Sequence, residues 1–244
     1  NGFDYASYLQ RQEIGATTYI PSGYWQKYGQ NTNFSLIRTA EKTQEKLMKI
    51  YRKFGISGDE FAVLAALTLG SKDALHPELR QNYTTSGGMH ILAVSGLHVG
   101  IIYIVLVFAF SFLGKSTKLK LLKTSLIILF LWFYAFITGL PPSVIRATLM
   151  FSLIALGTGL ERKAQIYNTI SMSAFFMLLV NPFFLFDVGF QLSFSAVVAI
   201  VYFQPKISKL LTITVKPLKW MWDLTAVSLA AQIGTAPFSI FYFH

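Results

Sequence analysis

The 244-residue chain has no cysteine and few charged residues. Without cysteine it can have no disulfide framework, no thiol nucleophile and no cysteine-ligated zinc or iron–sulfur site. Charged residues make up 13% of the sequence, about half the typical share of roughly 25%, whereas hydrophobic residues make up 53%. This composition excludes a disordered chain and argues against an ordinary soluble domain. Because the sequence begins at Asn1, we expect it to be a piece of a longer protein.

Acidic residues are scarce after residue 88. Residues 1–88 carry ten Lys/Arg and eight Asp/Glu, a net charge of +2, whereas residues 89–244 carry eleven and three, a net of +8. The few charges of the second part interrupt long apolar runs. Helices of about 20 apolar residues satisfy their own backbone hydrogen bonds inside lipid. The sequence therefore predicts an all-α fold, that of a polytopic helical membrane protein.

We expect six transmembrane helices in this chain. They cover residues 89–113, 121–139, 143–160, 164–180, 187–203 and 222–244. Pro141 and Pro142 separate the second span from the third, and Asn181-Pro182 ends the fourth. The predicted domains are a tail of an upstream extracytoplasmic domain (1–32), amphipathic and short apolar helices (33–88), and a transmembrane domain truncated at its C-terminus (89–244).

The basic residues of the second part fall on alternate connections between the predicted spans. These residues are Lys115, Lys118, Lys120, Lys123, Arg162, Lys163, Lys206, Lys209, Lys216 and Lys219. The other two connections carry no positive charge. The positive-inside rule places the basic loops in the cytoplasm and residues 1–88 outside. Membrane topology thus explains the net charge of +10, which is not by itself evidence for nucleic-acid binding.

Two helices are predicted before the membrane domain. The first begins at Asn33 as N-cap, ends at Gly55, and has one apolar and one basic face. It could lie in the headgroup layer, cap the membrane bundle, or be a surface helix with a solvated basic face. Ser57 and Glu60 resemble a capping box that opens a short apolar helix over residues 61–69.

The few polar groups inside the predicted spans are the candidate functional residues. They are His90, Ser95, His98, Arg146, Asp187 and Gln191. In the predicted orientation, independent spans bring all of them except Ser95 to the outer half of the membrane, and Ser95 shares a helix face with His98. An intramembrane charge is a functional candidate, but Arg146 and Asp187 can equally form a structural ion pair. The histidines can likewise serve helix–helix hydrogen bonding.

The first span also carries packing and chemical signals. Gly96 and Gly100 form a GxxxG pair, which lets a neighbouring helix approach closely. No His, Asp or Glu stands three or four residues from His90 or His98, so no metal site is predicted. A serine hydrolase built on Ser95 would need a G-x-S-x-G elbow, and the first glycine is missing. We expect no catalytic residues and no cofactor.

Several motifs in sequence order resemble those of the ComEC-type competence proteins, the inner-membrane channel for import of transforming DNA. Residues 90–100, HILAVSGLHVG, resemble the family signature. Similar elements are FDYASYL at 3–9, LTLGSKDAL at 67–75, GLPPSVIRA at 139–147, the Asn-Pro pair at 181–182 and DVGFQLSF at 187–194. The resemblance covers nearly the whole chain.

The resemblance implies an inner-membrane channel domain that conducts single-stranded DNA into the cytoplasm. Its implied partners are single-stranded DNA, membrane lipid, a cytoplasmic helicase or motor, and DNA-receptor proteins, and a homo-oligomer stays open. The path would be lined by the candidates His90, Ser95, His98, Arg146 and Gln191. Structural roles fall to Asp187, Gly96, Gly100, Pro141 and Pro142. The family's OB-type domain and its nuclease domain with metal ligands lie outside this chain, so we expect no enzymatic activity here.

Two other functions remain open at the level of sequence. A secondary transporter of a small solute could use Pro141-Pro142 and Asn181-Pro182 as helix breaks beside its site. An intramembrane hydrolase could use Ser95 with His98.

The orientation is testable by thiol labelling. A cysteine at Ser116 should react only with reagents that reach the cytoplasm, whereas one at Ser22 should react from outside, because basic loops stay cytoplasmic. The reverse pattern would overturn the assigned orientation.

Overall fold

A computed structural model describes Leu9 and residues 15–21, 35–71, 73–86, 88, 94–113, 116–160 and 165–243. Its helices are α2 (Leu36–Lys53), α3 (Gly58–Leu69), α4 (Pro77–Thr85), α5 (Gly96–Ala109), α6 (Thr117–Ile137), α7 (Pro142–Gly159), α8 (Ile166–Val180), the 3-10 helix η2 (Pro182–Phe186), α9 (Val188–Ser208) and α10 (Lys216–Phe243). These residues contain no strand, and the prediction of an all-α polytopic membrane protein is confirmed. Most of the predicted upstream tail lies outside the described residues.

Four described helices are long and apolar enough to cross a membrane: α6, α7, α9 and α10. The other two predicted spans are shorter, with 14 residues in α5 and 15 in α8. At 1.5 Å per residue they reach only about 21 and 23 Å, less than the hydrocarbon thickness of about 30 Å. The predicted starts of these spans, residues 89–93 and 164, lie outside the described residues.

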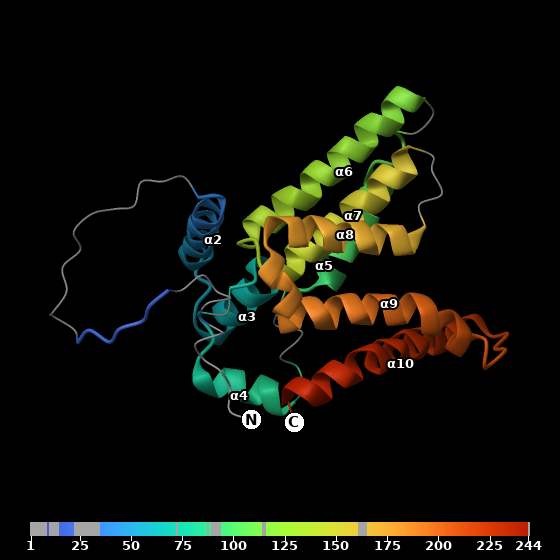
Figure 1. The fold of residues 1–244 in the computed structure, drawn as a ribbon. Helices are drawn as coiled ribbons and strands as arrows, with labels where there is room; N and C mark the ends of the chain where they lie inside the picture. Colours follow the sequence, from blue (N-terminus) through green and yellow to red (C-terminus); the bar gives the residue numbers. More distant parts are fainter. Residues whose placement is uncertain are drawn as a thin grey trace.

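The membrane helices alternate in direction. In Figure 1, α2, α3 and α4 gather at one end of the helix bundle, close to the ends at which α7 and α9 begin. Helices α6, α8 and α10 begin at the opposite end. The described lysines of the connections, including Lys120 and Lys209, belong to that opposite end. The end at which the connections between membrane helices carry lysines, called here the lysine-bearing end, is therefore opposite the end that carries α2–α4.

Helix α7 is the central helix of the bundle, because it contacts α5, α6, α8 and α9. On one side it shares a core with α5 and α6, centred on the fully buried Val99, Leu131 and Val144. On the other side it packs with α8 and α9 around Met177 and Phe190. Burial on both sides is possible because α7 carries small side chains between its large ones.

Helices α9 and α10 form an antiparallel hairpin whose two members pack mainly on each other. The two helices approach closely at Gly234, where a Cβ atom would lie 2.8 Å from the carbonyl oxygen of Ser195 and would overlap the Ala199 methyl group. A glycine is required there because the backbones nearly touch. The hairpin joins the rest of the bundle through α9, which contacts α7, α8 and η2.

Helix α2 caps the end of the bundle. Its N-cap is Ser35, two residues after the predicted Asn33, because the Ser35 hydroxyl accepts a hydrogen bond from the Arg38 N–H. Ala40 is fully buried. The Gln44 side chain donates to the carbonyl of Leu69 at 2.6 Å, and also to that of Thr138 at 3.2 Å.

These two carbonyls belong to the ends of α3 and α6, which both finish at a glycine in left-handed conformation. Gly70 has φ +75° and Gly139 has φ +81°, and a Cβ atom on Gly139 would lie 3.2 Å from the Gln44 amide. Helix α2 contacts α3 and α6, and its placement relative to the lipid headgroups stays a prediction. Ala40 is the buried residue of its apolar face, whereas Leu36, Ile37, Ile50 and Phe54 on the same face are exposed.

The predicted capping box at the start of α3 does not form. Ser57 is the N-cap, but its side chain makes no capping hydrogen bond. The next residue, Gly58, has φ +63°, which takes the backbone away from the geometry that a capping box requires. Helix α4 was not predicted separately, although Pro77 at its start and Glu78 in its first turn are typical helix-opening residues.

Replacement of Gln44 by Met should loosen the docking of α2. The change keeps the length of the side chain but leaves two helix-terminal carbonyls without a donor, at a cost of about 1–3 kcal/mol. The free energy of unfolding of the purified protein in detergent measures it. The control is Glu45→Met, an exposed neighbour on the same helix, where a change within about 0.5 kcal/mol is expected. Equal stability of the two variants would contradict the docking role.

Candidate functional site

Ser95 and His98 form a local hydrogen-bonded unit at the start of α5. The backbone N–H of Ser95 donates to His98 Nδ1 at 3.2 Å, and the Ser95 Oγ lies 3.1 Å from the same nitrogen. Ser95 is the N-cap with extended backbone, φ −120° and ψ 172°. The prediction that Ser95 lies on a helix face is therefore wrong, because the His98 ring binds the N–H of Ser95 and ends the helix there.

This geometry fixes the proton on the His98 ring. A backbone N–H can only donate, so Nδ1 is an acceptor, and the neutral ring carries its proton on Nε2. The Ser95 hydroxyl then donates to Nδ1 as well. One nitrogen lone pair thus serves two donors, and its contact with the Ser95 N–H is the one that the third helical residue makes in a capping box. His90, the other predicted histidine, lies outside the described residues.

The two signature glycines face α7. A Cβ atom on Gly96 would lie 3.4 Å from the Ala147 Cβ, and one on Gly100 would lie 3.1 Å from Cζ of Phe151. Ala147 and Phe151 are one turn apart, so the two glycines follow one ridge of α7. The close helix approach expected from the GxxxG pair is found.

Arg146 and Asp187 lie together, as expected for two charges at one membrane depth. Arg146 Nη1 lies 3.7 Å from Asp187 Oδ1, with side chains that are 10% and 44% exposed. The same Oδ1 accepts the N–H of Phe190 at 2.7 Å, so Asp187 is also the N-cap of α9. A Cβ atom on Gly189 would lie 3.1 Å from Asp187 Oδ1 and 3.4 Å from Arg146 Nη2, so an added side chain would crowd the carboxylate more than the guanidinium.

Gln191 holds three segments together. Its Nε2 donates to the carbonyl of Leu185 in η2 at 2.8 Å, and its Oε1 accepts from the Tyr242 hydroxyl at 2.9 Å. The amide therefore links the start of α9 to η2 and to the end of α10. Both ends of this predicted lining group are engaged within the fold.

Neither Pro141-Pro142 nor Asn181-Pro182 interrupts a helix. Pro141 is the N-cap and Pro142 the first residue of α7, after a turn in which Leu140 has φ +56°. Asn181 accepts the N–H of Phe183 and opens η2, in which Pro182 is the first residue. Both pairs start helices, where proline lacks no bonded N–H. The discontinuous helices on which a solute transporter depends are not found at these positions.

Helix α7 holds three buried polar atoms that have no partner among the described residues. They are Arg146 Nε, Thr148 Oγ1 and Ser152 Oγ. Of these three residues only Arg146 was predicted from the sequence, because short hydroxyl side chains in an apolar run are usually bonded to their own helix. Over the described part of the chain, no three His, Cys, Asp or Glu side chains lie close enough to hold a metal ion.

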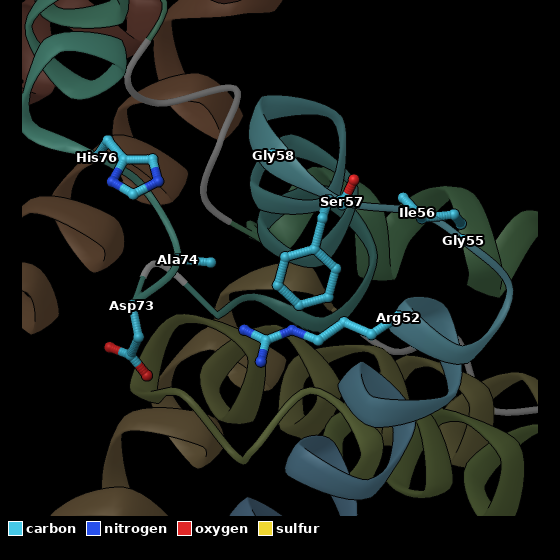
Figure 2. A pocket seen from close by; sticks show the side chains of 9 residues that line it. Arg52, Gly55, Ile56, Ser57, Gly58, Asp73, Ala74 and His76 are labelled. Carbon is cyan, nitrogen blue, oxygen red and sulfur yellow. The ribbon is translucent and has the colours of Figure 1, made fainter.

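A cavity of about 650 Å³ lies where α2, α3 and the segment before α4 meet. Figure 2 shows the Arg52 side chain reaching into it, with Asp73 and His76 on the opposite wall. The Arg52 guanidinium lies 4.7 Å from the centroid of the Phe61 ring, within cation–π range. No motif in the sequence pointed to this cavity.

Comparison with known proteins decides the family. The family model for Competence protein matches residues 67–244. ComE operon protein 3 of Bacillus subtilis is 32% identical over 252 residues, which cover 99% of this chain and 29% of the relative. This chain belongs to the competence protein family. An uncharacterized protein of Aquifex aeolicus is 32% identical over 139 residues, 57% of this chain and 32% of that protein.

This competence chain spans less than a third of the length of the two relatives. No solved structure matches it. The signature residues of this competence protein thus have a described arrangement: Ser95 and His98 cap α5, Gly96 and Gly100 contact α7, and Arg146 meets Asp187.

Replacement of Gly96 by Leu should abolish DNA import, because the added side chain would displace Ala147 and α7. Ser95→Ala should retain part of the activity, since the Ser95 N–H still donates to His98. Import of labelled DNA is measured at matched membrane levels of the full-length variants. Leu97→Phe, at a 72% exposed position of the same turn, is the control for bulk. A hydrolase would reverse the order, with Ser95→Ala inactive in a folded protein.

Proposed function

We propose that this domain conducts a single strand of DNA across the bacterial plasma membrane into the cytoplasm during natural transformation. Membership of the competence family supports a role in DNA uptake. The observation that carries the finer proposal is the Arg146–Asp187 pair, a nearly buried cation close to the end of the bundle near α2–α4. A strand of phosphates needs such a polar position where it leaves water.

The charge distribution supports the proposed direction. The described basic side chains of the connections belong to the lysine-bearing end; they are Lys118, Lys120, Lys123, Lys206, Lys209, Lys216 and Lys219. Connections at the other end, residues 138–141 and 181–187, carry no Lys or Arg. The positive-inside rule then puts the lysine-bearing end in the cytoplasm and α2–α4 outside. In this orientation Arg146 is on the side from which DNA arrives.

Arg146 has the chemistry for a transient phosphate contact. Its Nε has no partner among the described residues. Its Nη1 lies 3.7 Å from Asp187 Oδ1, which is within the range of an ion pair but too long for a hydrogen bond. Arginine binds phosphate through a fork of two N–H groups. A passing phosphate would compete with Asp187, and the carboxylate would restore the resting pair once the phosphate had left.

The other proposed contributions are weaker. Ser95, His98 and Gln191 are engaged in hydrogen bonds of the fold, so we assign them the positioning of helix ends beside the strand. His90 stays a proposed lining residue. Single-stranded DNA and lipid are the proposed partners, together with a cytoplasmic motor, DNA-receptor proteins and further copies of the chain. We propose no enzymatic step for this segment.

The Ser95–His98 contact is the one observation that favours a hydrolase. A nucleophile and its base lie at about 2.6–3.2 Å in such enzymes. Here, however, the base nitrogen also accepts the backbone N–H of Ser95, and an i, i+3 pair at a helix start is explained by capping. DNA conduction is therefore the better supported function.

Two conservative variants separate a phosphate-binding Arg146 from a structural one. Asp187→Asn removes the counter-charge but keeps a good N-cap for α9, whereas Arg146→Gln removes the cation itself. Both lose the ion pair, and stranding Arg146 costs up to about 3 kcal/mol. DNA import is compared at equal membrane levels.

If Arg146 contacts phosphate, import by Arg146→Gln should fall well below that by Asp187→Asn, by about tenfold or more for a lost charge-assisted contact. Arg146→Lys, which keeps the charge without the fork, should be intermediate. Equal import by all three variants would refute the phosphate contact.

A further inference from the structure

Helix α10 carries a line of polar side chains along one face. We call it the α10 polar stripe, and its members are Thr225, Ser228, Gln232, Thr235 and Ser239. Their spacing alternates between three and four residues, which keeps them within an arc of about 80° at 100° per residue. From first to last they rise about 21 Å at 1.5 Å per residue. The stripe therefore extends through most of a hydrocarbon layer of about 30 Å.

The stripe lies on the face of α10 that points away from α9. The face toward α9 is formed by the fully buried Ala226 and Ala230 and by Gly234, about half a turn round the helix from the stripe. Thr225, Ser228 and Gln232 are exposed. Packing between α9 and α10 thus leaves the polar stripe uncovered by the hairpin.

Lipid contact does not explain such a face. The exposed positions of α5, and those of α8 from Met172 onward, show what a lipid-facing surface of this protein contains, namely large apolar side chains: Leu97, Ile101, Ile104, Phe108, Phe175, Leu179 and Val180. Polar groups facing hydrocarbon cost free energy unless they find a partner. A stripe of five on one helix is therefore not a surface for lipid.

Hydrogen bonds within α10 satisfy only part of the stripe. The hydroxyls of Thr225 and Thr235 donate to the carbonyls of Met221 and Ala231, each at 3.0 Å. The side chains of Ser228 and Gln232 make no hydrogen bond to any described residue. An amide offers two donors and an acceptor, and water satisfies all three at once.

The course of the stripe connects the two ends of the bundle. Its last residues approach Tyr242, which bonds to Gln191 at the start of α9, four residues from Asp187. Its first residues lie beyond Lys219, at the lysine-bearing end. One or two polar residues would suffice to pair two helices. An uncharged polar stripe of this length is instead typical of the wall of a water-filled pathway. Its weak contacts allow a polyanion to bind and to leave again.

We propose that the α10 polar stripe lines the water-filled route by which the DNA strand crosses the membrane. This inference rests on the proposed function and adds the surface that performs it. Hydroxyl and amide groups donate hydrogen bonds to phosphate oxygens without holding them as a lysine would. The strand would pass from the Arg146 end along α10 to the lysine-bearing end.

Single-cysteine variants of the full-length protein in its own membrane test the stripe. Ser228→Cys and Gln232→Cys probe it, and Leu229→Cys and Ile233→Cys are matched controls at exposed positions of the neighbouring face. The chain itself contributes no other thiol. The probe is a charged, water-soluble methanethiosulfonate. A wetted stripe predicts labelling at least about tenfold faster at 228 and 232 than at the controls, because the reagent does not enter hydrocarbon.

The same cells report on DNA. Labelling of Gln232→Cys should lower import of labelled DNA at least about tenfold by narrowing the route, whereas labelling reactions on the control variants should leave import unchanged. Equal, slow labelling of all four thiols in cells that import DNA would overturn the inference and leave the proposed function standing. Fast labelling of the stripe without any loss of import would overturn the assignment to the strand. Import that survives deletion of the transmembrane domain would refute the proposed function itself.

Discussion

Close packing around α7 is the constraint on which the rest of the bundle depends. Inside lipid the hydrophobic effect does not drive helices together, so their association depends on shape and on polar contacts. Gly96 and Gly100 bring α5 against α7, and Gly159 on α7 itself packs closely on Thr124 of α6. Each contact is made at a residue without a large side chain. The family signature in α5 is therefore, in this fold, a surface for α7.

The second half of the bundle is attached differently. Helices α9 and α10 pack chiefly on each other, and the start of α9 meets α7 through Arg146 and Asp187. Asp187 has two tasks, since one oxygen both caps α9 and faces the guanidinium. Gln191 adds bonds to η2 and to Tyr242 within this region. Polar contacts at the start of α9 thus add to the apolar packing of α7 against α8 and α9.

The sequence predicted the fold class and the partner of Arg146, because charge is so rare in these spans that two charges at one depth must pair. It also predicted the close helix approach at Gly96 and Gly100. The sequence did not predict that α5 begins after Ser95. The apolar run continues through this position, and the capping contact of the His98 side chain carries no hydropathy signal. The docking of α2 through Gln44 was beyond sequence reasoning, since a single amide on an amphipathic helix carries no periodic signal. The α10 polar stripe does have such a signal, but a mean hydropathy reading averages it away.

The docking of α2 has an electrostatic consequence. Because Ala40 and Gln44 face the bundle, Lys42, Lys46, Lys49 and Lys53 form one exposed line on the opposite face, about 16 Å long at 1.5 Å per residue. Four like charges held on a rigid helix produce a local positive potential that reaches about 10 Å into 0.1 M salt and about 30 Å into 0.01 M salt. Polyanions near this end of the bundle are attracted over that range, so the rate of their encounter with it depends on ionic strength.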